Sequence, residues 1–406
     1  MIKELSFKNY SSFKEGATIS FKINGKVPDS YYRAKNLSTI MGIKGANGSG
    51  KTNILKAFSF LSDFLTKSAD KDVNDMIAVN SHFQNGLPSE FYIEFVSSDG
   101  TEYMYELSVN NREVLKESIH RRKPTQKTEV IVRIGNKIHR CISELDELKK
   151  VKLKSNASLV SIFRKFNFSA DMEDFEQIWG FFKRVVSNVK YTGMSGLIDQ
   201  YMGSNEVSEA YYEDKELFCF VKKILIESDT GIKDIDIKKG ENDVGETKYY
   251  AWFRHEYFGG EQELPLVDES NGTKRLYHMM YLYWIVLQVG GILVVDEFDT
   301  HLHSMILPKV LELFENKKTN PYNAQFIFTA HNTEIINYLG KYRAILVNKE
   351  NNESYCYRVD ELPSNLVKND RDLSKLYFSK KIGGTPEIDN DFSEININFG
   401  DQKELF

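Results

Sequence analysis

The chain of 406 residues is poor in cysteine, has no long apolar run and carries no strong excess of one charge. Its three cysteines, Cys141, Cys219 and Cys356, lie far apart and show no metal-ligand spacing. Their scarcity predicts reduced thiols in a cytoplasmic protein. No apolar run approaches the roughly 18 residues of a membrane-spanning helix. Because charged residues interrupt the first ten positions, we expect neither a signal peptide nor a membrane span.

The formal net charge of −5 provides no overall attraction for nucleic acid, so such a contact must come from a local patch. Residues 118–154 are locally basic, and one interpretation is a surface for nucleic acid or an acidic partner. The basic side chains are His120, Arg121, Arg122, Lys123, Lys127, Arg133, Lys137, Arg140, Lys149, Lys150, Lys152 and Lys154. We favour the alternative, a solvated hairpin face, because acidic residues interrupt the stretch. These are Glu129, Glu144, Asp146 and Glu147.

The clearest positive signal is a phosphate-binding loop at residues 45–52, which read GANGSGKT and fit G-x-x-x-x-G-K-[ST]. Residues 37–43 form an apolar, β-branched run typical of a buried strand, and residues 53–65 have helical spacing. Strand, glycine loop and helix together present backbone N–H groups and a helix N terminus to phosphate. The predicted nucleotide-binding residues are Asn47, Gly48, Ser49, Gly50, Lys51, Thr52 and Asn53. Lys51 is expected to reach the β- and γ-phosphates, and the Thr52 hydroxyl to bind Mg²⁺.

A second part of the site is predicted where the apolar run 291–295 ends in Asp296 and Glu297. The pattern indicates a buried parallel strand that delivers two acids at its carboxyl end, where ligands bind in α/β sheets. We expect Asp296 to hold Mg²⁺ and Glu297 to orient or deprotonate the attacking water. Asp296 follows Lys51 by 245 positions. This separation favours a split ATPase with an insertion over a compact GTPase.

Two further stretches are candidates for phosphate contacts. Residues 270–275 read SNGTKR and precede an apolar helix at 276–288. Ser270 is expected to cap that helix, so Ser270 and Gly272 would form a second phosphate-binding surface for a nucleotide held by another subunit. The apolar strand 325–330 ends at His331, which could contact the γ-phosphate, although a lone histidine is more often structural.

Along the chain the phosphate loop is followed by the SNGTKR stretch, then the acidic strand and then the strand that ends at His331. Four elements in this order resemble the ABC class of ATPases, specifically the OLD, RecF and SMC branch. Residues 270–273 occupy the signature position, and His331 resembles the switch histidine. Residues 2–13 are similar to the start of those proteins. His303 stands where transporters carry the aspartate of the D-loop, and the pair Leu302-His303 is instead similar to the OLD type. Gln84 has a plausible distance for the Q-loop but lacks a flanking motif.

The C-terminal part resembles standalone AAA-family ATPases found beside phage-defence nucleases, such as the RloA and PARIS AriA proteins. The residues that carry this likeness are Leu376-Tyr377 and the GGTP sequence at 383–386. The resemblance covers roughly residues 1–110 and 245–390. It implies ATP and Mg²⁺ as ligands and at least a head-to-head dimer.

The fold that follows is α/β: an ABC-type P-loop ATPase head with a mixed sheet, flanking helices, an antiparallel β subdomain and a largely helical insertion. We expect an N-terminal lobe at 1–115, an insertion of strands and then helices at 116–240, a C-terminal lobe at 241–390 and a tail at 391–406. Within the insertion, residues 157–189 and 217–226 have helical spacing.

In such a dimer, ATP is sandwiched between two heads. One subunit would supply Lys51, Thr52, Asp296, Glu297 and His331, and the other Ser270 and Gly272. The expected function is an ATP-hydrolysing switch in phage defence that controls a separate, co-encoded effector. The alternative is a DNA repair or recombination ATPase of the RecF or SMC kind, although no sustained heptad predicts a long coiled coil. A third hypothesis is a non-catalytic scaffold. The presence of Glu297 speaks against it, because a purely structural ATP site would not need this acid.

Overall fold

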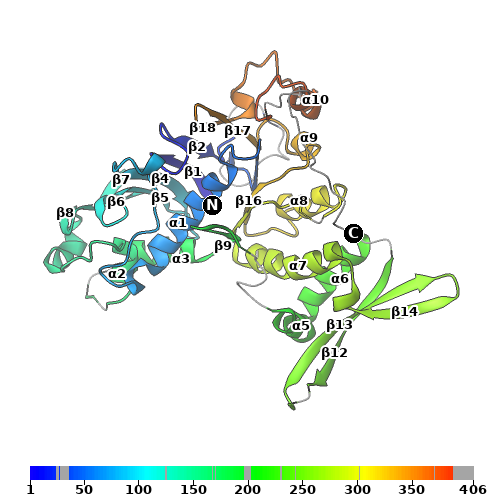
Figure 1. Cartoon of the computed structure of the whole chain (residues 1–406). Helices are drawn as coiled ribbons and strands as arrows, with labels where there is room; N and C mark the ends of the chain where they lie inside the picture. The colour runs from blue at the N-terminus through cyan, green and yellow to red at the C-terminus, as the bar shows by residue number, and fades with distance from the viewer. Residues whose placement is uncertain are drawn as a thin grey trace, which may run out of the picture.

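The computed structural model describes residues 1–23, 27, 36–123, 126–166, 168–169, 171–195, 203–228, 231–242, 244–300, 302–369 and 371–386 (Figure 1). The expected tail, residues 391–406, and His301 lie outside this description. Among the described residues, no helix combines the length and the apolar character that crossing a membrane requires.

Seven antiparallel strands form a sheet in the order β2-β1-β4-β5-β6-β7-β8. The strands are β1 Ile2–Lys8, β2 Ala17–Ser20, β4 Ser89–Val96, β5 Glu102–Val109, β6 Val114–Lys123, β7 Gln126–Ile134 and β8 Lys137–Cys141. Alternate residues such as Phe91, Ile93 and Phe95 are buried on one face. Period-two burial of this kind is what makes one face of an antiparallel sheet pack on a core while the other meets solvent.

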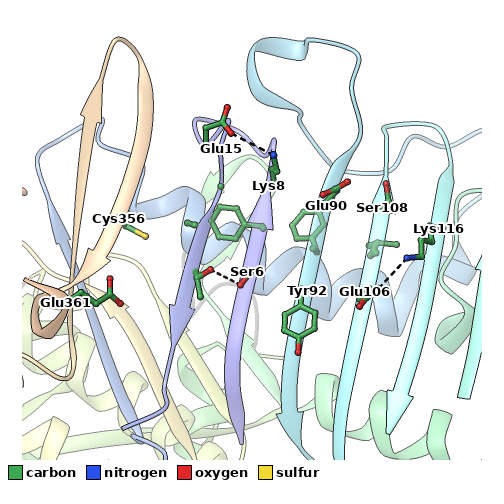
Figure 2. A pocket seen from close by; sticks show the side chains of 16 residues that line it. Ser6, Lys8, Glu15, Glu90, Tyr92, Glu106, Ser108, Lys116, Cys356 and Glu361 are labelled. Carbon is green, nitrogen blue, oxygen red and sulfur yellow. Dashed lines mark hydrogen bonds and ion pairs between the residues drawn. The ribbon is translucent and has the colours of Figure 1, made fainter. Parts of the chain in front are cut away.

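The outer face of this sheet is polar and carries an open hollow of about 690 Å³ (Figure 2). Glu90, Tyr92 and Glu106 project from neighbouring strands there, and Lys116 reaches Glu106 at 3.5 Å. No residue of the phosphate loop lines this hollow. It is therefore a feature of the sheet surface and separate from the nucleotide site described below.

A second sheet, in the order β18-β17-β3-β16-β15-β9, carries the phosphate loop. The strands are β3 Ile40–Gly45, β9 Val185–Ser187, β15 Ile292–Val295, β16 Gln325–Thr329, β17 Ala344–Glu350 and β18 Glu353–Arg358. All neighbouring pairs are parallel except β17 with β18. The carboxyl ends of β9, β15, β16 and β3 consequently lie at one edge, where binding sites form in such sheets.

Helices bury both faces of this sheet, which explains its continuous apolar runs. In β15, Ile292 and Val294 join the core under α1 (Lys51–Lys67), whereas Leu293 and Val295 join the core under α7 (Asn271–Val289). The helices α2 Leu159–Phe163 and α3 Glu173–Lys183 pack beside α1. The helices α8 Leu307–Glu315, α9 Ile335–Leu339 and α10 Leu373–Phe378 belong to the second core.

A three-stranded antiparallel sheet projects from the body beside α7 (Figure 1). It consists of β12 Ile232–Glu241, β13 Thr247–Tyr257 and β14 Gly260–Pro265. The helices α5 Ser204–Glu213 and α6 Lys215–Ser228 pack on it. A short hairpin, β10 Val189–Lys190 with β11 Gly193–Met194, follows β9. The expected α/β fold, with a phosphate loop in a mixed sheet beside an antiparallel sheet, is confirmed.

One helix expectation is wrong. Residues 157–189 contain two helices, α2 and α3, and then the strand β9. The Ser158 side chain caps α2, and Val185 and Val186 pair with Ile292 and Leu293 of β15. Tertiary pairing of a β-branched pair overrides the helical spacing of its neighbours here. The expected boundary at 115/116 falls inside β6, and β9 joins the core sheet from within the stretch 116–240.

A buried ion pair links the antiparallel sheet to the segment that leads into α2. The side chains of Glu117 and Arg133 are both fully buried, with Nη1 3.3 Å from Oε2. Arg133 also donates to the carbonyls of Gly135 (2.6 Å) and Ala157 (2.6 Å). Glu117 accepts the backbone N–H of Leu159 at 3.0 Å. Each charge is thus compensated by several partners, which is the condition under which a buried pair is tolerated.

We expect Arg133→Met to destabilise the protein strongly, because it leaves Glu117 buried without its cation. Breaking a buried pair in this way costs about 3–5 kcal/mol. The urea midpoint of unfolding should fall accordingly. Arg140→Met is the matched control, since Arg140 makes a largely exposed ion pair with Glu129. Equal midpoints for the two variants would contradict this assignment.

Candidate nucleotide-binding site

The phosphate loop joins β3 to α1 and depends on two glycines with positive φ, Gly48 at 74° and Gly50 at 109°. A Cβ on Gly50 would lie 2.7 Å from the hydroxyls of both Ser12 and Ser354. The first backbone bonds of α1 run from Asn53 and Ile54 to the carbonyl of Gly50. The amides of Lys51 and Thr52 precede them and point out of the helix N terminus, where they can donate to phosphate.

Lys51 lies folded over the loop and donates to the carbonyls of Gly45 and Ala46, both at 2.9 Å. Burial lowers the pKa of Lys51, and the nearby Asp296 and Glu297 partly offset that effect. The Ser49 hydroxyl is buried in the same loop without a hydrogen-bond partner. An ammonium held by carbonyls and an unpaired hydroxyl are groups that phosphate oxygens would satisfy.

Asp296 stands at the carboxyl end of β15 and is only 5% exposed. Its two carboxylate oxygens accept from Thr52 Oγ1 (2.8 Å) and Thr329 Oγ1 (2.5 Å). Its backbone is held on both sides by Asn188, which accepts from the Asp296 N–H (2.7 Å) and donates to the Asp296 carbonyl (3.0 Å). The helix α1 and the strand β16 therefore hold the carboxylate, and the residue after β9 holds its backbone.

The position of Asp296 beside Thr52 suits Mg²⁺, a hard cation that takes oxygen ligands and is bound in ATPases by one or two side chains together with phosphate. Thr52 Oγ1 and Asp296 Oδ2 would hold the ion. Thr329 and Asn188 would orient the carboxylate, as the outer partners of metal ligands do.

Glu297 and His331 lie side by side at the same edge, with Oε1 and Nε2 3.5 Å apart. The Glu297 backbone has a φ of 52°, a strained value for a residue with a side chain. Its N–H donates to Thr329 Oγ1 (2.8 Å), and its carbonyl accepts from Arg275 (3.2 Å). The Glu297 and His331 side chains are 40% and 50% exposed, so both face solvent in a single chain.

Ser270 caps α7, and its hydroxyl accepts the Thr273 N–H at 3.1 Å. Ser270 and Gly272 line a small pocket of about 210 Å³ together with His303 from the segment after the acidic strand. The lining of this pocket includes no phosphate-loop residue. Within one chain the structure brings together Lys51, Thr52, Asp296, Glu297 and His331, whereas Ser270 and Gly272 line a separate pocket that none of these residues lines.

Sequence reasoning missed several side chains that hold the site, among them Asn188 and Thr329. Gln84, which was considered for the Q-loop, lies in the turn His82–Gln84 and lines a surface hollow with Asn110 and Tyr191. The strand beside the acidic strand is β9, and Asn188 follows it directly. The β-branched pair Val185-Val186, followed by polar residues, is a sequence pattern that could have indicated the strand. The helical spacing of the residues around it predicted a helix instead.

The chain belongs to the family described as "AAA domain, putative AbiEii toxin, Type IV TA system", which matches residues 40–337. This range contains the phosphate loop, the acidic strand and His331. No curated protein matches the chain.

Several solved structures are similar over most of the chain. The SMC head domain from Thermotoga maritima is 15% identical, with 88% of this chain and 98% of that chain covered and a TM-score of 0.41. The Smc head domain bound to the C-terminal domain of ScpA from Pyrococcus furiosus is 14% identical, with 89% of this chain and 97% of that chain covered and a TM-score of 0.45. The recombination mediator protein RecF with ATP is 14% identical, with 82% of this chain and 92% of that chain covered and a TM-score of 0.34. Strand order and the phosphate loop define the fold of this chain.

We expect Thr329→Val to weaken the Mg²⁺ site, because it leaves one Asp296 oxygen and the Glu297 N–H without their partner. Loss of such an outer partner typically costs about 10–100-fold in metal affinity. A titration of Mg²⁺ against ATP hydrolysis measures the effect. Thr319→Val is the control, since its hydroxyl bonds to the Leu313 carbonyl instead (2.7 Å). An unchanged Mg²⁺ dependence of the Thr329 variant would rule out this role.

Proposed function

We propose that the protein is a Mg²⁺-dependent ATPase whose hydrolysis site is completed by a second head, and that it acts as a switch on assembly. The observation that carries the proposal is the Asp296 carboxylate bonded to Thr52, beside the Glu297–His331 pair. A buried metal position next to an exposed acid and histidine is the arrangement that phosphoryl transfer to water requires.

Each side chain has a distinct part in this reaction. Lys51 leaves the Gly45 and Ala46 carbonyls and neutralises the β- and γ-phosphates. Glu297 orients the attacking water and accepts its proton, and His331 donates to the γ-phosphate. Thr52 and Asp296 would hold Mg²⁺, which when bound would offset the charge that develops on the phosphate oxygens.

We infer a second head because the two phosphate-binding surfaces of one chain are separate. The N terminus of α7 at Ser270 and Gly272 can take a phosphate, but its pocket excludes the chain's own phosphate loop. Glu297 and His331 are both substantially exposed. A head-to-head homodimer in which Ser270 and Gly272 face the partner's ATP would cover these groups. Hydrolysis then removes the link between the two heads, which makes ATP a switch.

We further propose a role in phage defence that acts on a separate, co-encoded effector in the cytoplasm. The family description, which names a putative AbiEii toxin and a type IV toxin–antitoxin system, supports this role. So does the resemblance of the residues near the C terminus to the RloA and PARIS AriA ATPases. The described residues contain no cluster of three or more metal-ligating side chains that would serve as a nuclease centre.

The alternative, a DNA repair ATPase of the RecF or SMC kind, needs a basic surface. The basic stretch 118–154 is instead substantially paired with acids. The pairs include Arg121–Asp174, Arg122–Glu94, Arg133–Glu117, Arg140–Glu129 and Lys149–Asp146. A surface neutralised in this way is a poor phosphate binder, because ion pairing competes with the counterion release that drives binding to DNA.

We expect Glu297→Gln to bind ATP and to accumulate as a dimer, because it keeps the side-chain shape but removes the base. Size-exclusion chromatography with light scattering, run with ATP and Mg²⁺ and then with ADP, measures the mass. Lys51→Ala is the control and should remain monomeric in both, since it loses the phosphate contact. A monomer for Glu297→Gln with bound ATP would overturn the shared site.

A further inference from the structure

The loop that carries His331 is held by several hydrogen bonds to its backbone. Both oxygens of Asp299 accept the His331 N–H, at 3.0 and 2.9 Å, and Oδ2 also accepts the Asn332 N–H at 2.5 Å. In addition, Lys44 Nζ donates to the His331 carbonyl at 2.6 Å. One peptide segment is thus held between a carboxylate and an ammonium, which come from the acidic-strand loop and from β3.

Lys44 is an unusual residue for this position because it is 6% exposed near the end of a buried strand. Burial lowers the pKa of Lys44 to about 8, with Asp299 opposing the shift and Lys51 adding to it. The ring of Tyr377 also contacts the ammonium, with its centroid 5.1 Å from Nζ. A buried ammonium of this kind is costly unless it is paired and hydrogen-bonded, as Lys44 is to the His331 carbonyl.

The helix α10 also bonds to this loop. Ser374, in its first turn, donates through Oγ to the Thr333 carbonyl at 3.1 Å. Asn337 of α9 secures that turn by accepting the Ser374 N–H (3.0 Å) and donating to Asp372 (2.9 Å). The other end of the segment is anchored through Tyr377, whose hydroxyl donates to the Gly384 carbonyl at 2.6 Å.

We propose that Lys44 and Asp299 are positioning residues for ATP hydrolysis, which hold the His331 loop against Glu297. Ser374 of helix α10 adds a further bond to this loop, and we call Lys44, Asp299 and Ser374 together the frame of the His331 loop. The inference rests on the proposed function, because it gives these residues a part in the same reaction. The side chain of His331 is half exposed, so its location depends on the backbone that carries it. A displacement of about 1 Å in a catalytic group can cost 100-fold in rate.

The test compares steady-state ATP hydrolysis of the full-length chain with Lys44→Met, Lys44→Arg and Asp299→Asn. Lys44→Met keeps the stem and removes the donor, so kcat should fall about 10–100-fold while KM stays within about twofold. Lys44→Arg should recover most of this loss, because arginine can still donate to the carbonyl. Asp299→Asn should lower kcat in the same way. Ser374→Ala should have a smaller effect of the same kind.

Lys341→Met is the matched control, because Lys341 also donates to a backbone carbonyl, that of Val367 at 3.1 Å, but lies outside the frame. Its kcat should equal that of the wild type. Thermal unfolding of every variant identifies any that has lost its fold. If Lys44→Met is such a variant, Asp299→Asn and Ser374→Ala decide the matter.

The pH profile of kcat provides a readout that a purely structural role would not move. Since the pKa of Lys44 is lowered to about 8, its ammonium is lost as the pH rises through that value. Wild-type kcat should therefore decline above about pH 8, and Lys44→Arg should retain its plateau there. Asp299 and Lys51, the other charged groups that face Lys44, are present in both proteins and do not account for a difference.

The outcomes separate the inference from the function on which it rests. A wild type that binds no ATP or does not hydrolyse it defeats the proposed function itself. A wild type that hydrolyses ATP, together with Lys44→Met and Asp299→Asn variants of equal kcat, overturns only the positioning role. A Lys44→Met variant with raised KM and unchanged kcat would also overturn it, because it would make Lys44 a direct ligand of ATP.

Discussion

The Asp296 carboxylate is the interaction on which the rest of the site depends. One oxygen takes the hydroxyl of Thr52 from α1, and the other takes that of Thr329 from β16. Asn188 holds the backbone from β9. A shift in any of these elements would move a buried charge away from its partners, which is energetically costly. The parallel sheet therefore has one register in which the metal position, the phosphate loop and the acid Glu297 coincide.

The same constraint divides the site into a rigid half and an open half. Asp296 and Lys51 are buried, whereas the side chains of Glu297 and His331 are 40% and 50% exposed. The parts that bind phosphate and metal are thus organised within one chain. The parts that would act on water face outward, which leaves them available to a surface from another head. A switch needs this division, because binding must precede the contact that hydrolysis later removes.

The sequence predicts the fold class correctly, and it places the candidate phosphate-binding residues in one local stretch, because both depend on neighbouring residues. The phosphate loop, its strand and its helix lie within one short stretch, and the apolar run before Asp296 indicates a buried strand by itself. Thr329, Asn188, Asp299 and Lys44 could not be predicted in the same way. Their roles depend on strand order, which places residues from 32 to 287 positions apart in contact, as with Asn188 and Asp296 at 108. The helical expectation for the end of 157–189 is wrong for the same reason, since β9 pairs with β15, whose residues lie more than 100 positions away.

A mixing experiment tests the shared site most directly. The Ser270→Arg chain keeps its phosphate loop but loses the surface that would face a partner's ATP, and the Lys51→Ala chain has the opposite defect. The account predicts that each chain alone hydrolyses almost no ATP, and that an equimolar mixture regains turnover from the one intact composite site of the heterodimer. Turnover by the Ser270→Arg chain alone at the wild-type rate would contradict the account, because it would make the site complete within a single head.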